Sequence, residues 1–442
     1  MKELTKGKPW KVILLFAIPI MCRSVFQQFY NFVDSKIVST YISTKAFAAV
    51  GATTVVSNTI IGFLAGFTQG FAISVANSYG AKDYKRMRKY IAGSIVLAFS
   101  IAVILMVVSL FFIDDLLRML ATPDDIMEDA LAYVKIILFG IIFTAVYNLC
   151  ANILMSVGDS KTPLYCLIAA LIINTGLDFL FVKGLSMGIK GAAYATIISQ
   201  AIAGGLCVIY IFTRFKMIVP SKEDWRLEKK QYPELFTTGL SMGLMGCIVN
   251  VGSIVLQNAI NKLGTAYVAA HTAARKLFDM LTILMFSIAV AITTYVSQNM
   301  GAGKFARVRQ GIRQAIYMTM ITTTFLIFVC YTFGEGILKW ITSTDDPTII
   351  SAAVMYMKIS ILFFYVLGPL LIFRCSLQGM GHKIMPLFSS GMEMIVKIVS
   401  ANLIVPVFAY KGVAFTEPIS WVLMTIMLTV SYMIARPKGD GE

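Results

Sequence analysis

The stretch SYGAKDYKRMRK (78–89) lies between two long apolar segments, and it returns in altered form as QNMGAGKFARVRQ (298–310). The alignment places Gly80, Ala81, Arg86 and Arg88 on Gly301, Ala302, Arg307 and Arg309, 221 positions later. AYVKI (132–136) matches MYMKI (355–359) 223 positions later, and KGAAYATIIS (190–199) matches KGVAFTEPIS (411–420) 221 positions later. Several matches in the same order at nearly one offset indicate that the chain is a duplication.

The composition predicts a membrane protein. Of the 442 residues, 58% are hydrophobic and only 14% are charged. The apolar runs repeatedly reach the roughly 20 residues that cross about 30 Å of hydrocarbon as a helix. About twelve such segments lie near 12–38, 46–77, 91–113, 130–156, 164–182, 191–213, 233–261, 267–298, 312–333, 350–377, 387–406 and 412–435. The expected fold is therefore an all-α polytopic membrane protein with about 12 transmembrane helices in two six-helix bundles.

The net charge of +15 follows the connections between these segments. Basic residues collect in 2–11, 82–89, 214–230 and 304–309, whereas the connections 113–129 and 334–347 are acidic. By the positive-inside rule the basic set is cytoplasmic, and so are both termini. The charge therefore predicts orientation in a bilayer, and no nucleic-acid partner is expected.

The longest polar connection falls at the midpoint of the duplication. We predict an N-terminal bundle at 1–213, a cytoplasmic linker at 214–233 and a C-terminal bundle at 234–442. An even number of helices in each half makes the repeat parallel, and two such bundles predict a transporter that alternates access by rocking one bundle against the other. The alternative is a duplicated scaffold without a transport role.

Charged side chains inside the first-half segments are functional candidates, because charge in a span is costly unless it faces a cavity or a partner. Asp34 ends a polar stripe formed by Arg23, Gln27, Tyr30 and Asn31, which we expect to line the substrate cavity. Asn174 and Asp178 share one face of the stretch ALIINTGLDFLF (170–181). Such a pocket suits a proton acceptor or a Na⁺ site at Asp34, Asn174 and Asp178. The alternative is a pair of carboxylates that merely holds helices together.

The duplication argues against that structural alternative. At the repeat offsets, Asp34 falls on Val255, Asn174 on Lys397 and Asp178 on Ala401. The second half therefore keeps the scaffold but lacks the acidic pair.

The second half has its own charged residues. Arg275 with Asp279, and Glu393 with Lys397, have the i,i+4 spacing of ion pairs on one helix. Mutual neutralisation and the polar wall of a substrate cavity are both open interpretations. Arg374 and Arg23 are left without an acidic partner. They predict either a water-filled cavity or a substrate that carries a negative or polar group beside an apolar body.

The sequence contains no convincing motif of a soluble enzyme. GLSMG occurs at 184–188 and 239–243, but neither copy follows a strand, and the two histidines, His271 and His382, suggest no triad. No GxxxxGK[ST] phosphate loop is present, which argues against ATP-driven pumping within this chain. We expect that the protein is not an enzyme.

Several stretches carry a family resemblance, namely FQQFYNFVDSKIV (26–38), AFAAVGAT (46–53), YGAKDYKRMRK (79–89), SVGDSKTPL (156–164), INTGLDFLFV (173–182), GAAYATIISQ (191–200) and SQNMGAGK (297–304). Together they resemble the multidrug and toxic compound extrusion (MATE) family, and the first-half aspartates look like its bacterial DinF-like branch.

That resemblance implies xenobiotic export from a bacterial inner membrane by H⁺ or Na⁺ antiport. The implied cation site comprises Asp34, Asn174, Asp178 and Thr196, with Asn148 or Asn152 nearby. It implies no cofactor beyond the coupling ion, a small organic substrate, the lipid bilayer as surroundings and a monomer. The charges Arg23, Arg275, Arg374 and Lys397 depart from a cationic-drug cavity. A lipid-linked oligosaccharide flippase on the same scaffold and a major-facilitator transporter are the alternatives.

Overall fold

A computed structural model describes residues 3–120, 122–226, 231–342, 344 and 346–439, and these residues form helices and turns with no strand among them. The chain separates into two compact units. The first comprises Pro19–Leu244 with Glu3, and the second comprises Leu4–Ile18 with Met245 and the residues that follow. The unit boundaries at 18/19 and 244/245 fall within two helices, each of which begins in one unit and finishes in the other.

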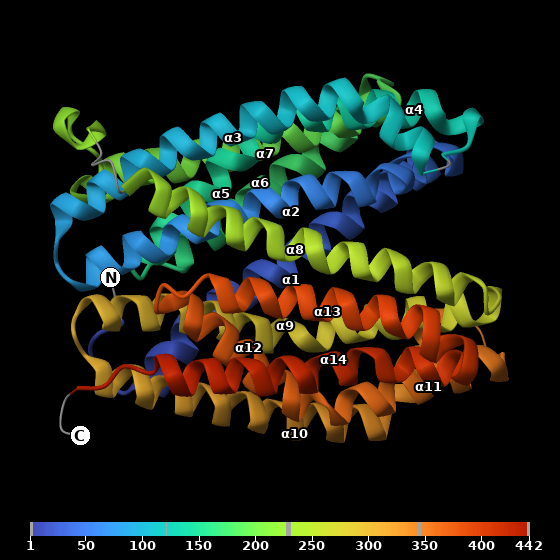
Figure 1. Cartoon of the computed structure of the whole chain (residues 1–442). Helices are drawn as coiled ribbons and strands as arrows, with labels where there is room; N and C mark the ends of the chain where they lie inside the picture. The colour runs from blue at the N-terminus through green and yellow to red at the C-terminus, as the bar shows by residue number, and fades with distance from the viewer. Residues whose placement is uncertain (1–2, 121, 227–230, 343, 345, 440–442) are drawn as a thin grey trace. The chain divides into compact units, whose positions relative to one another are not determined.

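The first unit contains most of the N-terminal half (Figure 1). Its helices are α1 (Pro9–Tyr41, from Pro19 on), α2 (Thr44–Gly80), α3 (Tyr84–Met119), α4 (Asp124–Phe139), α5 (Ile141–Ser156), α6 (Lys161–Asp178) and α7 (Gly188–Arg214). A π-helical turn, η1 (Phe179–Gly184), follows α6, and the short turns η2 (Lys216–Ile218) and η3 (Lys222–Trp225) follow α7. Helix α5 packs against both α2 and α7 around a core that includes Phe67, Phe71 and Leu154.

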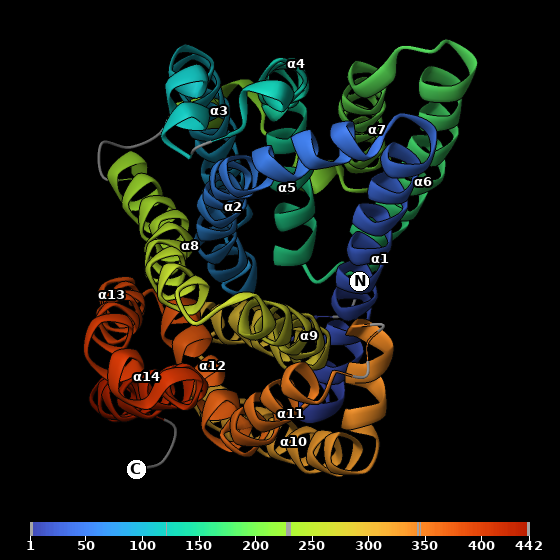
Figure 2. The ribbon, with the colours of Figure 1, turned by 90° about the vertical axis from the view of Figure 1, so that its right-hand side faces the viewer.

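The second unit has the matching elements. They are α8 (Gln231–Asn261, from Met245 on), α9 (Thr265–Gly301), α10 (Phe305–Thr342), α11 (Pro347–Leu362), α12 (Phe364–Gly379), α13 (Ile384–Val399), the π-helical turn η4 (Ser400–Ile404) and α14 (Val405–Ala435). Helix α12 lies beside α9 and α14, as Figure 2 shows from the end of the unit.

The duplication is confirmed at the level of helix boundaries. Helix α9 begins and ends 221 residues after α2, and the pair α11–α12 begins and ends 223 residues after the pair α4–α5. Both pairs are bent at the junction, by 44° in the first half and 53° in the second. A π-helical turn follows both α6 and α13.

The number of spans agrees with the sequence. In the described residues, nine helices are long and apolar enough to cross a membrane, and each of the two bent pairs supplies one more span. One of the nine, Ile384–Ala435, has 52 residues, or about 78 Å of helix, which is more than twice the hydrocarbon thickness. It is interrupted at Ala409, whose φ is 48°, so it makes two spans. Twelve spans result.

The beginning of α8 packs closely on α2 within the first unit. A Cβ atom on Gly70 would lie 2.7 Å from the Gly239 Cα, and one on Gly66 would lie 2.7 Å from the Met242 carbonyl oxygen. The GLSMG sequence at 239–243 therefore serves helix packing, since glycine lets two backbones approach.

The described part of the predicted linker is attached to the first unit. The Asp224 carboxylate is buried, and it accepts hydrogen bonds from the Arg88 guanidinium and the Ser221 backbone N–H, both at 2.8 Å. Burial alone would raise the pKa of Asp224, but these hydrogen bonds outweigh it and hold the pKa below its usual value. The linker prediction also includes residues 227–230, which lie outside the described residues.

The second unit holds segments from both ends of the chain at its α9–α10 connection. The Arg307 guanidinium donates to the Gly7 carbonyl at 2.7 Å, and the Arg309 guanidinium donates to the Pro437 carbonyl at 2.8 Å. Residues from near the start and near the end of the chain therefore meet at the same end of this unit.

Candidate functional site

The first-half carboxylates lie together inside the first unit. Asp34 projects from α1, whereas Asn174 and Asp178 occupy the last turn of α6. All three side chains are buried, and Asn174 and Asp178 have no exposed surface. The Asp34 and Asp178 carboxylates are close enough to interact electrostatically. Asp178 also marks the change from α-helix to the π-helical turn η1, a local irregularity that is frequent at functional sites.

The polar atoms of this group lack partners. Among the described residues, Asp34 Oδ1, both carboxylate oxygens of Asp178, and the amide oxygen and nitrogen of Asn174 are buried without a hydrogen-bond partner in the protein. Buried polar groups are normally paired, because an unpaired one costs about 1–3 kcal/mol. Both buried carboxylates therefore have acceptor atoms that no hydrogen bond from the described residues uses.

Tyr30 and Thr196 border the carboxylate group. The Tyr30 hydroxyl lies 3.3 Å from Ser199 Oγ and beside the Thr196 hydroxyl, and it interacts electrostatically with both carboxylates. Thr196 itself donates to the Ala192 carbonyl within α7. From the sequence we placed Tyr30 in the polar stripe with Arg23, Gln27 and Asn31. In the structure it lies beside Asp34 and Asp178.

The other predicted first-half residues have different surroundings. Asn152 donates to Thr68 Oγ1 at 3.1 Å and ties α5 to α2, whereas Asn148 is half-buried and makes no hydrogen bond within the described residues. Arg23 lies beside the Tyr147 hydroxyl. Of the remaining stripe residues, Gln27 is half-buried and Asn31 is exposed.

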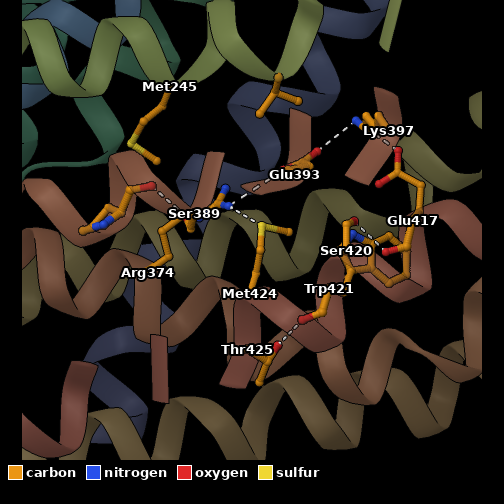
Figure 3. Close-up of polar contacts among 12 residues, drawn as sticks. Met245, Arg374, Ser389, Glu393, Lys397, Glu417, Ser420, Trp421, Met424 and Thr425 are labelled. Atoms are coloured by element: carbon orange, nitrogen blue, oxygen red, sulfur yellow. Dashed lines mark hydrogen bonds and ion pairs between the residues drawn. The ribbon is translucent and has the colours of Figure 1, made fainter. Parts of the chain in front are cut away.

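A cluster of charged side chains lies inside the second unit (Figure 3). Lys397 Nζ lies 2.9 Å from Glu393 Oε1, 3.2 Å from Glu417 Oε1 and 3.1 Å from Ser253 Oγ. The Lys397 side chain is only 3% exposed. Arg275 extends the cluster, since it approaches both Glu417 at 3.4 Å and Asp279 at 3.5 Å. The predicted i,i+4 pairs are therefore present, but each belongs to a larger network.

Arg374 corrects one expectation. It does have an acidic partner, because its Nη2 lies 3.8 Å from Glu393 Oε2 on the neighbouring helix α13. The other contacts of its guanidinium are weak. Nη2 approaches the Met424 sulfur at 3.2 Å, and the buried Nε has no hydrogen-bond partner among the described residues. A guanidinium carries five N–H donors, so Arg374 keeps donor capacity for a ligand.

Glu417 is the site residue that the sequence reasoning missed. The alignment of KGAAYATIIS with KGVAFTEPIS places Glu417 on Thr196, and the same repeat places Lys397 on Asn174. A comparison of the polar residues that this alignment pairs would have identified Glu417 and Lys397 as a candidate buried ion pair. In the second half, a lysine ammonium held by three oxygens thus occupies the place where the first half has unpartnered carboxylate and amide atoms.

Two duplicated six-span bundles with buried charged groups define a multi-pass membrane transporter. The MatE family model matches residues 19–180 and 242–403, one match in each repeat. The chain belongs to this family, whose members are transporters and not enzymes. The match removes the major-facilitator alternative.

Individual relatives agree with this assignment. The chain is 27% identical to the probable multidrug resistance protein YpnP of Bacillus subtilis, over 82% of this chain and 80% of that protein. An outward-facing structure of a multidrug resistance MATE transporter of the MOP superfamily superposes with a TM-score of 0.91 at 20% identity, covering 99% and 98% of the two chains. A Pyrococcus furiosus MOP-superfamily transporter, described as having a binding pocket of reversed polarity, superposes with a TM-score of 0.89 at 20% identity, covering 99% and 98%. These structural likenesses establish the fold.

Proposed function

We propose that this transporter exports amphipathic organic compounds in exchange for H⁺ or Na⁺ that binds at Asp34 and Asp178. The observation that carries the proposal is the set of five buried, unpartnered atoms on Asp34, Asn174 and Asp178. Carboxylate and amide oxygens are ligands for hard cations, and a proton on one carboxylate would remove the same excess of charge.

Cation binding would bias the conformation through α1. Asp34 lies on α1 and Asp178 at the end of α6, so a cation between them would hold the two helices together. Pro19 lies at the point where α1 passes from the second unit to the first, and a proline inside a helix removes a backbone hydrogen bond and permits a bend. Rocking of the bundles would then follow from different cation affinities of the two end states.

The second half would contribute no further cation site. Lys397 supplies a permanent ammonium at the position of Asn174, and Glu393 and Glu417 already neutralise it. We therefore propose that coupling depends on the first unit alone.

Flux in proteoliposomes with separately imposed Na⁺ and pH gradients tests this assignment. Wild-type protein should export substrate under one of the two gradients, and Asp34→Asn and Asp178→Asn should each reduce this export to the level of empty liposomes. Asp115→Asn is the matched control, since Asp115 is exposed near the end of α3. Near wild-type export by either site variant, in protein that elutes like the wild type, would remove the cation site from these residues.

For the substrate, we propose an apolar body with a negative or polar group that Arg374 recognises. Arg374 has one acidic partner at 3.8 Å and a buried Nε without a partner. The Pyrococcus furiosus transporter of the same fold is described as having a reversed pocket polarity, which makes a non-cationic substrate a reasonable class for this scaffold. A lipid-linked oligosaccharide, which carries phosphate, would use the same group and stays the second candidate.

A transport panel distinguishes these substrate classes. It compares a lipophilic cation such as ethidium with amphipathic anions of similar size, in wild type and in Arg374→Gln. The proposal predicts anion export that falls at least about tenfold in Arg374→Gln, because charge-assisted hydrogen bonds contribute about 1.5–3 kcal/mol. Export of ethidium alone, unchanged in Arg374→Gln, would return the protein to the cationic-drug class.

The basic connections further support an orientation with both termini in the cytoplasm, in the inner membrane of a bacterial cell. Cysteine accessibility from each side of the membrane checks it: a cysteine at Lys82 should react from the cytoplasm, and one at Asp115 from the opposite side.

A further inference from the structure

A cavity of about 580 Å³ lies in the second unit between the start of α10 and the end of α14, with α12 behind it. It is separate from the charged cluster around Lys397. Its walls combine three guanidinium groups with apolar side chains, among them Arg309, Arg313, Arg436, Ile316, Phe373 and Met433.

The polar side of the cavity is positively charged. Arg309 and Arg313 lie one turn apart on α10, and Arg436 follows the last residue of α14. None of the described residues that line the cavity is acidic. Arg309 is fixed by its hydrogen bonds to the Pro437 and Gly439 carbonyls. Arg309 and Arg436 also interact electrostatically with the Tyr432 hydroxyl, so these two guanidinium groups lie near the same point of the cavity wall.

The cavity lies at the edge of the predicted hydrocarbon. From Gln314 to Gly334, α10 carries no Asp, Glu, Lys or Arg, and α14 carries none from Pro418 to Ala435. Arg313 and Arg436 are therefore the charged residues that border these two spans at the end where the cavity lies. This is the level at which phospholipid headgroups lie.

Apolar stripes run from the cavity along both helices. On α10, the exposed residues Tyr317, Ile321, Phe325 and Phe328 continue the face of Arg313 at spacings of three and four. On α14, Ile426, Val430 and Met433 are exposed with the same spacings. Two apolar tracks beneath a basic pocket match the shape of an acyl chain attached to a negatively charged headgroup.

We propose that this cavity binds an anionic phospholipid of the leaflet that faces the basic connections. The headgroup phosphate would lie among the three arginines, since guanidinium groups bind phosphate with paired hydrogen bonds. The acyl chains would follow the apolar stripes of α10 and α14. The site would anchor the α9–α10 connection and the C-terminal segment to the membrane surface, independently of the transported substrate.

Native mass spectrometry of the full-length protein tests the proposal, with phosphatidylglycerol and phosphatidylcholine of identical acyl chains. Wild type should retain phosphatidylglycerol at about tenfold lower lipid concentration than phosphatidylcholine. The double variant Arg313→Gln/Arg436→Gln should lose this preference, while Arg309 is kept because it holds the C-terminal carbonyls. Arg214→Gln, an exposed arginine at the end of α7, is the matched control and should behave as wild type.

Two results would overturn the proposal. One is equal retention of the two lipids by wild type; the other is an unchanged preference in the double variant whose elution and helix content match the wild type. A third arm distinguishes a lipid from a free anion: glycerol 3-phosphate at millimolar concentration should not displace phosphatidylglycerol. If it does so at concentrations comparable to the lipid, the cavity binds phosphate alone and the lipid assignment fails.

Discussion

Lys397 shows how one exchange between repeats changes the chemistry of a buried site. Its ammonium has three oxygen partners within 3.2 Å and almost no exposed surface. Its repeat counterpart, Asn174, has no hydrogen-bond partner for its amide among the described residues. It lies one turn before Asp178, whose carboxylate interacts electrostatically with Asp34. In the second half, the Lys397 side chain therefore supplies a cation to the buried carboxylates. In the first half, we propose that a bound H⁺ or Na⁺ takes this role.

Lys397→Met should lower the free energy of unfolding by about 3–5 kcal/mol, because it removes the cation that the buried Glu393 and Glu417 share. The contacts that remain, from Arg374 at 3.8 Å and Arg275 at 3.4 Å, are longer. Denaturation in mixed micelles measures this loss. Lys276→Met, which removes an exposed lysine on α9, is the control and should change stability by less than about 0.5 kcal/mol. A Lys397→Met variant as stable as this control would mean that the network is not a balanced ion cluster.

For these residues the sequence predicted ion pairs within one helix, but not the network of ion pairs that joins several helices. The spacing of Arg275 with Asp279 and of Glu393 with Lys397 revealed contacts within one helix. The contacts of Glu417 with Lys397 and of Arg374 with Glu393 join different helices, and the packing that brings those helices together cannot be read from spacing along one of them.

The crossing of α2 and α8 depends on glycine at four positions. Gly66 and Gly70 on α2 face Gly239 and Gly243 on α8, and a Cβ at each would lie within 3 Å of the opposite helix. This contact fastens the first part of α8 to the first unit, although α8 finishes in the second.

Gly70→Val should destabilise the protein by about 1–3 kcal/mol, because overpacking forces the two backbones apart. Gly62→Val is a control on the same helix, since a Cβ there meets nothing within 4 Å. Thermal unfolding in detergent should separate the two variants. Equal melting temperatures for both would contradict the close contact.

The Arg88–Asp224 ion pair should hold the linker on the first unit across the neutral pH range. The pKa of Asp224 is lower in the folded protein than its usual value of about 3.9. Its stabilisation is therefore fully present above about pH 4 and is lost as the pH falls through the lower folded pKa. Hydrogen exchange at the Ser221 amide, corrected for the intrinsic rate, should show constant protection from pH 8 to about pH 4 and a decrease below it.

Asp224→Asn should remove this protection already at pH 7, because it removes the charge that accepts from Arg88 and Ser221. Glu223→Gln changes an exposed neighbour and should leave the protection intact. Unchanged protection in Asp224→Asn would show that the ion pair does not hold the linker.

At the level of the helices, the sequence repeat and the hydrophobic runs were sufficient to predict twelve membrane spans. The bends within α4–α5 and α11–α12 were not predicted, because the apolar runs continue through both junctions. The docking of the linker was also missed: a charged, polar stretch is typical of a solvated connection, and only the tertiary contact with Arg88 shows that Asp224 is buried.

At the scale of the whole molecule, the two halves share helix boundaries but differ in charge. The first half has unpartnered carboxylates, whereas the second has a neutralised cluster. Helices α1 and α8 each begin in one unit and finish in the other, so a change at Asp34 on α1 has a covalent route to the second unit. We propose that this arrangement allows alternating access to be driven by one cation site.

We propose that cation and substrate bind in alternation. A ligand shifts a conformational equilibrium only by its different affinities for the two states, so a cation at Asp34 and Asp178 must weaken substrate binding if it drives export. The direct measurement is a set of substrate-binding isotherms for purified wild type and the double variant Asp34→Asn/Asp178→Asn, recorded across pH 5.5–8.5 and with Na⁺ or K⁺. We expect the wild-type Kd to rise at least about fivefold as either H⁺ or Na⁺ increases, and the Kd of the double variant to stay constant. Wild-type isotherms that superimpose at every pH and Na⁺ concentration would contradict the claim.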